Sequence, residues 1–140
     1  MATPPYFRSN TRSKKIASFT KAIIERRFKH PMDIAVSTKH HLWLDIDAYH
    51  SRSVLADLIV YARAVVEEIG GGFKICETPN GYHIFFNARL RRWNDVVRLL
   101  RSASVILDKY IDKNWLSAVL RRQYITLRLN CIRWVYTYRW

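Results

Sequence analysis

Alternating apolar and polar residues predict several short strands in this chain. In residues 42–48 every second side chain is apolar, so Asp45 and Asp47 share the opposite face of the predicted strand. Residues 82–86 alternate in the same way, and the Pro-Asn-Gly sequence before them favours a tight turn that pairs them with a strand at 73–77. Further strands are predicted at 32–37, 124–129 and 131–140.

Apolar residues at helical spacing predict four helices, at 14–28, 51–69, 90–111 and 115–120. The order of elements, α-β-β-α-β-β-α-α-β-β, predicts an α+β fold in which helices pack on one side of a mainly antiparallel sheet. Within it we expect an N-terminal helix and an additional C-terminal hairpin. We expect residues 1–12 to be a flexible basic arm and residues 13–140 to form a single α+β nucleic-acid-binding domain, for the reasons that follow.

The net charge of the chain indicates what kind of partner the protein binds. The chain of 140 residues carries 24 Lys and Arg against 11 Asp and Glu, a net charge of +13, and no acidic residue follows Asp112. A surface of this kind attracts polyanions, of which DNA and RNA are the commonest in a cell. No apolar run is long enough for a membrane span, and the N-terminus lacks the apolar core of a signal peptide. We therefore expect a cytoplasmic protein that binds nucleic acid and no membrane.

The candidate phosphate contacts are the basic residues of the N-terminal helix, of the 90–111 helix and of the C-terminal third. A solvated helix face would carry the same residues, so the two interpretations remain compatible. The candidates are Lys14, Lys15, Lys21, Arg26, Arg27, Arg91, Arg92, Arg121, Arg122, Arg128, Arg133 and Arg139.

Asp45 and Asp47 are the candidate metal ligands. Two carboxylates on one strand face repel each other unless a cation lies between or beside them, and oxygen ligands suit Mg²⁺ or Mn²⁺. The alternative is a solvated face on which both acids pair with Lys or Arg. His83, in the 82–86 strand, is either a phosphate ligand or a hydrogen-bonded sheet residue.

The sequence around these residues resembles the catalytic core of archaeo-eukaryotic primases, of the small type found in archaeal and viral mobile elements. Leu44-Asp45-Ile46-Asp47 matches the Asp-x-Asp strand of that family, and Gly81-Tyr82-His83 matches its second motif. The resemblance covers roughly residues 32 to 130 and implies an RRM-like sheet. It also implies metal binding by Asp45 and Asp47, phosphate binding by His83, and nucleotidyl transfer with these three as catalytic residues.

The chain departs from that family in one respect that bears on activity. The family has a third acidic motif on a later strand, whereas the later acids here, Asp95, Asp108 and Asp112, are predicted in a helix or a loop. Two functions therefore stay open. One is a primase-like nucleotidyltransferase that uses Mg²⁺ or Mn²⁺. The other is a non-catalytic basic component of a nucleoprotein particle, ribosome-associated or viral.

The two cysteines and the aromatic C-terminus have more ordinary interpretations. Cys76 and Cys131 lack metal-ligand spacing and are expected to be reduced thiols. The C-terminal strand alternates, which predicts that its aromatic side chains share one buried face and its arginines the other. A stacking platform for single-stranded bases is the alternative. The aromatic residues concerned are Trp134, Tyr136, Tyr138 and Trp140.

Overall fold

Antiparallel sheets and three helices make up the described part of the chain, which in this computed structural model is residues 8–9 and 35–140. The strands are β1 (Arg8–Ser9), β2 (Ala35–Thr38), β3 (Trp43–Asp47), β4 (Phe73–Thr78), β5 (Gly81–Phe86), β6 (Ile125–Arg128) and β7 (Arg133–Tyr138). The helices are α2 (Arg52–Ile69), α3 (Trp93–Ile106) and α4 (Lys113–Arg122). The α+β fold class is thereby confirmed. The predicted helix at 14–28 lies outside the described residues.

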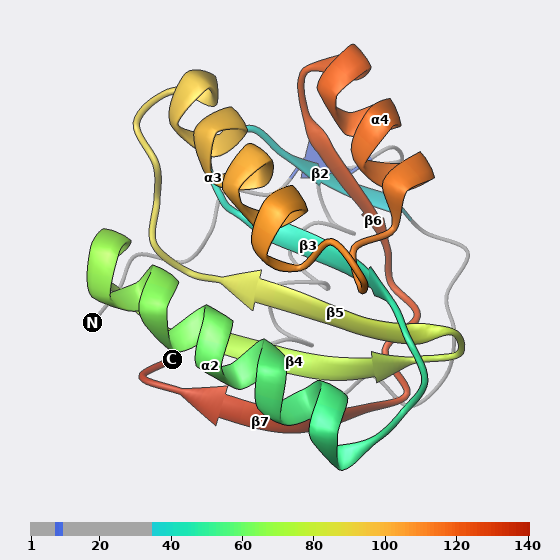
Figure 1. The fold of residues 1–140 in the computed structure, drawn as a ribbon. Helices are drawn as coiled ribbons and strands as arrows, with labels where there is room; N and C mark the ends of the chain where they lie inside the picture. The colour runs from blue at the N-terminus through green and yellow to red at the C-terminus, as the bar shows by residue number, and fades with distance from the viewer. Residues whose placement is uncertain (1–7, 10–34) are drawn as a thin grey trace.

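The strands form two sheets, with the order β3-β5-β4-β7 in one and β1-β2-β6 in the other (Figure 1). The predicted hairpin is the β4–β5 pair, joined through Pro79 and Asn80. β3 pairs with the other edge of β5, in a register that sets Asp45 opposite His83. The short β1, within the segment predicted to be an arm, pairs with β2.

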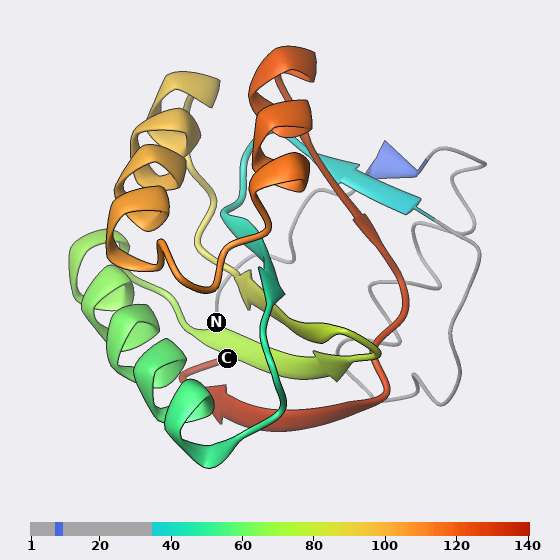
Figure 2. The ribbon, with the colours of Figure 1, turned by 45° about the vertical axis from the view of Figure 1, so that its right-hand side comes forward.

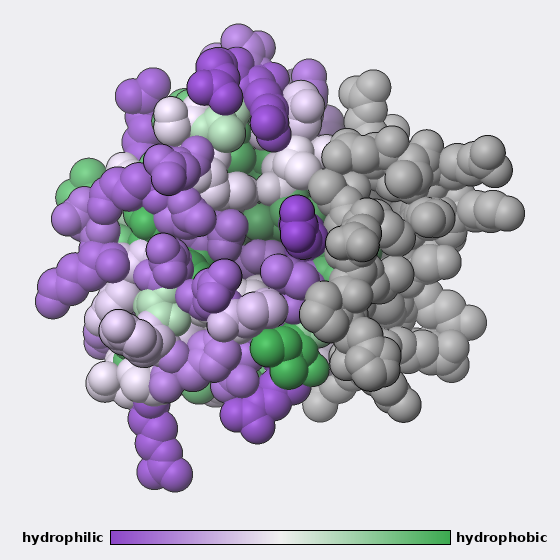
Figure 3. Space-filling view, turned by 90° about the vertical axis from the view of Figure 1, so that its right-hand side faces the viewer, coloured by the Kyte–Doolittle hydropathy of each residue, from purple (hydrophilic) through white to green (hydrophobic). Residues whose placement is uncertain are grey.

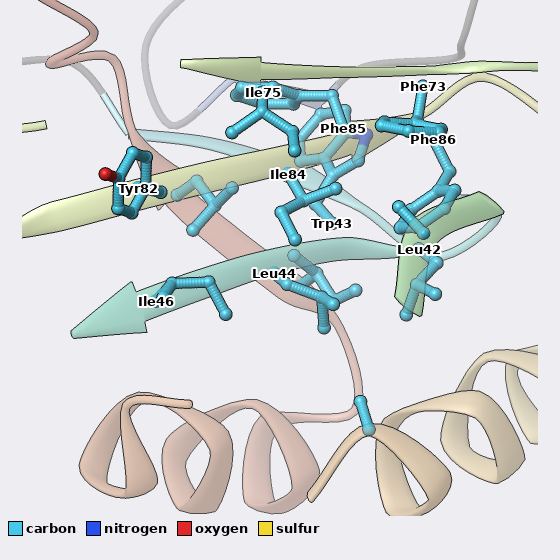
Figure 4. Close-up of a cluster of buried hydrophobic side chains, with 14 of the residues drawn as sticks. Leu42, Trp43, Leu44, Ile46, Phe73, Ile75, Tyr82, Ile84, Phe85 and Phe86 are labelled. Atoms are coloured by element: carbon cyan, nitrogen blue, oxygen red, sulfur yellow. The ribbon is translucent and has the colours of Figure 1, made fainter. Parts of the chain in front are cut away.

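The three helices lie on one side of the sheets (Figures 1 and 2). Leu44 and Ile46 of β3 and Ile84 of β5 point toward this helical layer, and each is at most 1% exposed (Figure 4). α2 begins after Ser51, whose hydroxyl accepts a hydrogen bond from the Val54 N–H, and ends at Gly70, whose φ of 81° suits glycine. Burial of these apolar faces is the main force that holds sheet and helices together.

The C-terminal hairpin prediction is wrong. β6 pairs with β2 and β7 pairs with β4, so the two last strands belong to different sheets. Alternation in the sequence identified both strands and the inward face of β6, whose residues Ile125 and Leu127 are buried. It could not identify their partners, because pairing depends on where the chain crosses between the sheets.

The aromatic residues of β7 do not all share a face. A β-bulge between Ile75 and Cys76 of the neighbouring strand shifts the register, so Trp134 pairs with Cys76 whereas Tyr136 pairs with Ile75. The rings of Tyr136 and Tyr138 therefore pack on Phe73, with centroids 5.7 and 5.5 Å away. Trp134 and Trp140 lie instead around the ammonium group of Lys74, at 5.3 and 5.2 Å.

The helix predicted at 90–111 is shorter than expected. α3 ends at Ile106, and the chain then turns so that Ile111 forms a β-bridge with Ile46 on the free edge of β3. None of the described helices is long and apolar enough to cross a membrane.

Candidate functional site

A pocket of about 1120 Å³ lies where the end of β3, the β4–β5 turn, the segment after α3 and strand β6 meet. Asp45, Asp47 and His83 all line it. Hydrophilic side chains cover most of the described surface on the side of the molecule where the β4–β5 turn lies (Figure 3). The structure therefore brings the three residues of the two sequence motifs into one pocket.

Strand pairing sets the geometry of Asp45 and His83. The two residues are opposite each other in the β3–β5 register, and Asp45 Oδ1 lies 3.5 Å from His83 Nε2. The Asp45 side chain is 27% exposed, whereas that of His83 is 4% exposed. The other ring nitrogen of His83, Nδ1, is buried without a hydrogen-bond partner. The ring therefore presents one nitrogen toward the carboxylate and keeps the other inside the sheet.

Asp47 is exposed at the end of β3, two residues beyond Asp45. Among the described residues, no Lys or Arg lies within ion-pair distance of either carboxylate. The interpretation of this face as one neutralised by Lys or Arg therefore finds no support in the part of the chain that is described. Negative charge at this strand end is left available to a cation.

A third carboxylate, that of Asp112, lines the same pocket. The Asp112 N–H donates to the Asp45 carbonyl, and the Asp47 N–H donates to the Tyr110 carbonyl, so residues 110–112 run along the free edge of β3. The Asp112 side chain also accepts a hydrogen bond from the Trp115 N–H at the start of α4. Sequence analysis placed Asp112 directly after a helix predicted at 90–111 and gave it no contact with β3, so its position at the pocket was missed.

The three carboxylates do not form a closed metal cage. Within residues 8–9 and 35–140, the one group of three potential ligands whose atoms lie within 4.8 Å of one another is Cys76, His83 and Cys131. Asp45, Asp47 and Asp112 thus surround the pocket without converging on a single point. A divalent ion here would bind one or two carboxylates and keep several waters, which is the usual arrangement for Mg²⁺.

The basic candidates in the described residues are exposed but differently placed. Arg128 lines the pocket, together with Lys109, which sequence analysis did not select. Arg91, Arg92, Arg121 and Arg122 are exposed away from the pocket lining. Lys14, Lys15, Lys21, Arg26 and Arg27 lie outside the described residues.

The two C-terminal arginine candidates pair within the protein. Arg133 forms two 3.0 Å hydrogen bonds with Glu77, and this carboxylate raises the pKa of Arg133. Arg139 lies 3.8 Å from Glu67. Both guanidinium groups are exposed, but each already has a carboxylate partner.

Two further residues shape the rim of the pocket. Tyr49 is 93% exposed beside Asp47, which makes it an accessible aromatic ring at the pocket edge. His50 Nε2–H donates to the carbonyls of Thr78 and Gly81, at 2.7 and 3.0 Å, and so ties the β4–β5 turn to the end of β3. No periodic pattern in the sequence marks either residue, because both follow the strand in an irregular loop.

His41 is on the same alternating face of the sequence as Asp45 and Asp47, but it does not line the pocket. It is fully buried, and its Nδ1 is hydrogen-bonded to the Thr38 hydroxyl at 3.0 Å. Burial, with smaller effects from Arg89 and His40, lowers the pKa of His41 to about 4. Its role is structural.

Cys76 and Cys131 form a disulfide, which contradicts the prediction of two reduced thiols. Cys131 lies in the crossing from β6 to β7, and this crossing brings it beside β4 although 55 residues separate the two cysteines. The spacing in the sequence carried no signal for the pairing, because the pairing depends on that crossing. The bond joins β4 to the β6–β7 crossing at Cys76, which pairs with His83 of β5.

Gly81 allows the close approach of β3 to β5 at the pocket. A Cβ atom at this position would collide with the Ile46 carbonyl oxygen. We predict that Gly81→Ala lowers the free energy of unfolding by about 2 kcal/mol, the usual cost of overpacking. Urea unfolding would measure it, with Asn80→Ala, at an exposed position of the same turn, as a control expected to change it by less than about 0.5 kcal/mol. Equal stability of Gly81→Ala and wild type would contradict this role.

Comparison of the chain with protein-family models, with curated proteins and with solved structures found no match.

Proposed function

We propose that the protein binds nucleic acid through phosphate contacts and that a divalent cation, Mg²⁺ or Mn²⁺, binds at Asp45 and Asp47. The observation that carries this proposal is the pocket that collects Asp45, Asp47 and His83, with no Lys or Arg of the described residues paired to either carboxylate. A cation there would bridge the carboxylates to a phosphate group. His83 and the pocket-lining Arg128 would then contact the phosphate oxygens.

The arrangement of charge supports an extended polyanion as the ligand. The chain carries a net charge of +13, and the pocket lining contains Lys109 and Arg128 as well as the three acidic residues. Exposed arginines at the end of α4, Arg121 and Arg122, provide further positive charge. Because such contacts displace condensed counterions, the resulting affinity depends strongly on salt and little on base sequence.

The order of elements supports a primase-like core. The segment β3-α2-β4-β5-α3 follows the first five elements of the β-α-β-β-α-β unit of ferredoxin-like folds, and the two motifs lie on its paired strands β3 and β5. Asp112 adds a third carboxylate beside the edge of β3. The sequence had suggested that such a third acidic position was missing. On this basis we propose metal-dependent nucleotidyl transfer as the activity, with Asp45, Asp47 and His83 as its catalytic residues.

One observation favours the alternative, a non-catalytic nucleic-acid-binding component of a nucleoprotein particle. Among the described residues, Asp45, Asp47 and Asp112 do not come within 4.8 Å of one another as a group of three ligand atoms. A binding module needs no such convergence. The two functions share the phosphate contacts and differ in the requirement for the metal.

The salt dependence of nucleic-acid binding tests the function that both alternatives share. Arg128→Ala should weaken binding to single-stranded RNA and DNA oligonucleotides alike and reduce the slope of log K against log salt by about 0.7, the value for one phosphate contact on a single strand. Arg98→Ala is the matched control, because Arg98 is an exposed arginine on α3 that pairs with Glu68. Absence of binding at low salt by the wild type would contradict the proposal.

Tyr49 should contribute by stacking on a base at the pocket rim, since its ring is 93% exposed. We predict that Tyr49→Ala weakens binding of a single-stranded oligonucleotide by roughly tenfold, the lower part of the range for one base–aromatic stack. Tyr49→Phe, which keeps the ring, should bind like the wild type. Fluorescence anisotropy would measure both, and equal affinity of Tyr49→Ala and wild type would exclude stacking at this position.

A further inference from the structure

Four side chains that can bind a metal ion or hydrogen-bond to a metal ligand lie next to one another across the larger sheet. Asp45, His83 and Cys76 are direct neighbours on β3, β5 and β4, and Cys131 joins Cys76 from the β6–β7 crossing. His83 is 3% exposed, Cys76 is fully buried and Cys131 is 1% exposed. Nδ1 of His83 has no hydrogen-bond partner although it is buried. A buried imidazole nitrogen without a partner is costly, which calls for an explanation.

We propose that the reduced form of the protein binds one Zn²⁺ ion through the thiolates of Cys76 and Cys131 and through Nδ1 of His83. The potential ligand atoms of the three residues lie within 4.8 Å of one another. Two ligands of one zinc ion are at most about 4.6 Å apart, because zinc binds sulfur at about 2.3 Å and nitrogen at about 2.0 Å. Once the disulfide is opened, the two sulfurs must move apart and the imidazole must shift only slightly for all three ligands to reach one ion.

The chemistry of this set selects zinc over the harder ions proposed for the carboxylates. Thiolate and imidazole are preferred ligands of zinc, whereas Mg²⁺ and Mn²⁺ prefer oxygen. Three protein ligands leave a fourth tetrahedral position for water. Asp45, which lies 3.5 Å from His83 Nε2, would accept a hydrogen bond from the metal-bound imidazole and so fix its tautomer.

The site exists only when the disulfide is open, so binding depends on redox state. A thiol reductant, such as the glutathione-type thiols of the cytoplasm, transfers two electrons to the Cys76–Cys131 bond, which gives two protein thiols and one disulfide of the reductant. Zinc then binds as both thiols lose their protons to solvent. A two-electron disulfide oxidant reverses the sequence, re-forms the protein disulfide and releases the ion.

The consequence is a cross-link between β4 and the β6–β7 crossing in either redox state. The disulfide joins β4 to the β6–β7 crossing when the protein is oxidised, and zinc would join the same elements when it is reduced. Zinc on Nδ1 and Asp45 on Nε2 would leave His83 no nitrogen for a phosphate, so the phosphate contact proposed for His83 belongs to the oxidised form.

Titration of cobalt, a spectroscopic substitute for zinc, into the reduced wild-type protein under anaerobic conditions tests the proposal without any substitution. We expect one equivalent to bind with an intense thiolate-to-cobalt charge-transfer band, and we expect zinc to displace it. The oxidised protein should show no such band. No charge-transfer band in the reduced protein, or the same band in the oxidised protein, would overturn the proposal.

Two substitutions separate a thiolate-only site from the proposed one. His83→Gln should lower zinc affinity by at least about tenfold, and Asp45→Asn by about tenfold through the loss of the hydrogen bond to the imidazole. Asp108→Asn, at an exposed acid outside the pocket, is the control and should bind as the wild type does. Circular dichroism would establish that each variant is folded. Unchanged affinity in a folded His83→Gln protein would exclude His83 as a ligand.

Discussion

Opening the Cys76–Cys131 bond in the presence of a chelator is expected to lower the free energy of unfolding by about 4 kcal/mol. The bond closes a loop of 55 residues, and the chain-entropy relation for a loop of this length gives about that value. The bond also fixes to strand β4 the segment that crosses from β6 in one sheet to β7 in the other. A loss of this size is a large fraction of the stability of a domain of this length.

Urea unfolding of oxidised and reduced wild-type protein would measure this effect with no change of sequence. Cys76→Ala/Cys131→Ala should unfold near the midpoint of the reduced protein, and it should not respond to reductant. The chelator keeps zinc from restoring the cross-link. Equal midpoints for the oxidised and reduced proteins would show that the disulfide does not stabilise the fold.

Acidification from pH 7.5 to pH 4.5 is expected to cost up to about 3 kcal/mol of stability through His41 alone. Burial lowers the pKa of this residue to about 4, against 6.5 for an unperturbed histidine. Between these values the unfolded chain binds a proton that the folded chain excludes, so protonation favours unfolding. The stabilisation is therefore complete above about pH 6.5, falls as the pH drops, and is lost as the pH approaches 4.

The slope of unfolding free energy against pH isolates this contribution from those of the carboxylates. In His41→Gln the slope between pH 6.5 and pH 4.5 should decrease by up to about 1.4 kcal/mol per pH unit. Thr38→Val removes the hydrogen bond to His41 but leaves the ring buried, so its slope should stay close to that of the wild type. An unchanged slope in His41→Gln would show that His41 does not control acid stability.

The centre of the site could be predicted from sequence because local patterns determine it. Alternation placed Asp45 and Asp47 on one strand face, and the Pro-Asn-Gly turn placed His83 on a strand of the adjoining hairpin. These two local patterns, together with the pairing of β3 with β5, bring Asp45 next to His83. The boundaries of α2 and the fully buried face of β3 follow from similar local patterns.

The rest could not be predicted because it depends on contacts between distant segments. Asp112 reaches the pocket because α3 ends early and residues 110–112 pair with the edge of β3, whereas the apolar pattern continued past that point. The disulfide depends on the β6–β7 crossing, and the split of the β7 aromatics depends on a bulge in the pairing with β4. In each case the outcome depends on pairing between segments that are distant in the sequence.

Calorimetric titration of Mn²⁺ into the oxidised protein, with and without a nucleoside triphosphate, tests the central claim most directly. In this form the cysteine thiolates are absent, so the carboxylates are the ligands under test. We predict binding that tightens with the nucleotide, persists in the control Asp108→Asn and disappears in Asp45→Asn/Asp47→Asn. Absence of Mn²⁺ binding by the wild type, or equal binding by the double variant, would contradict a metal site at these carboxylates; salt-sensitive nucleic-acid binding alone would then define the function.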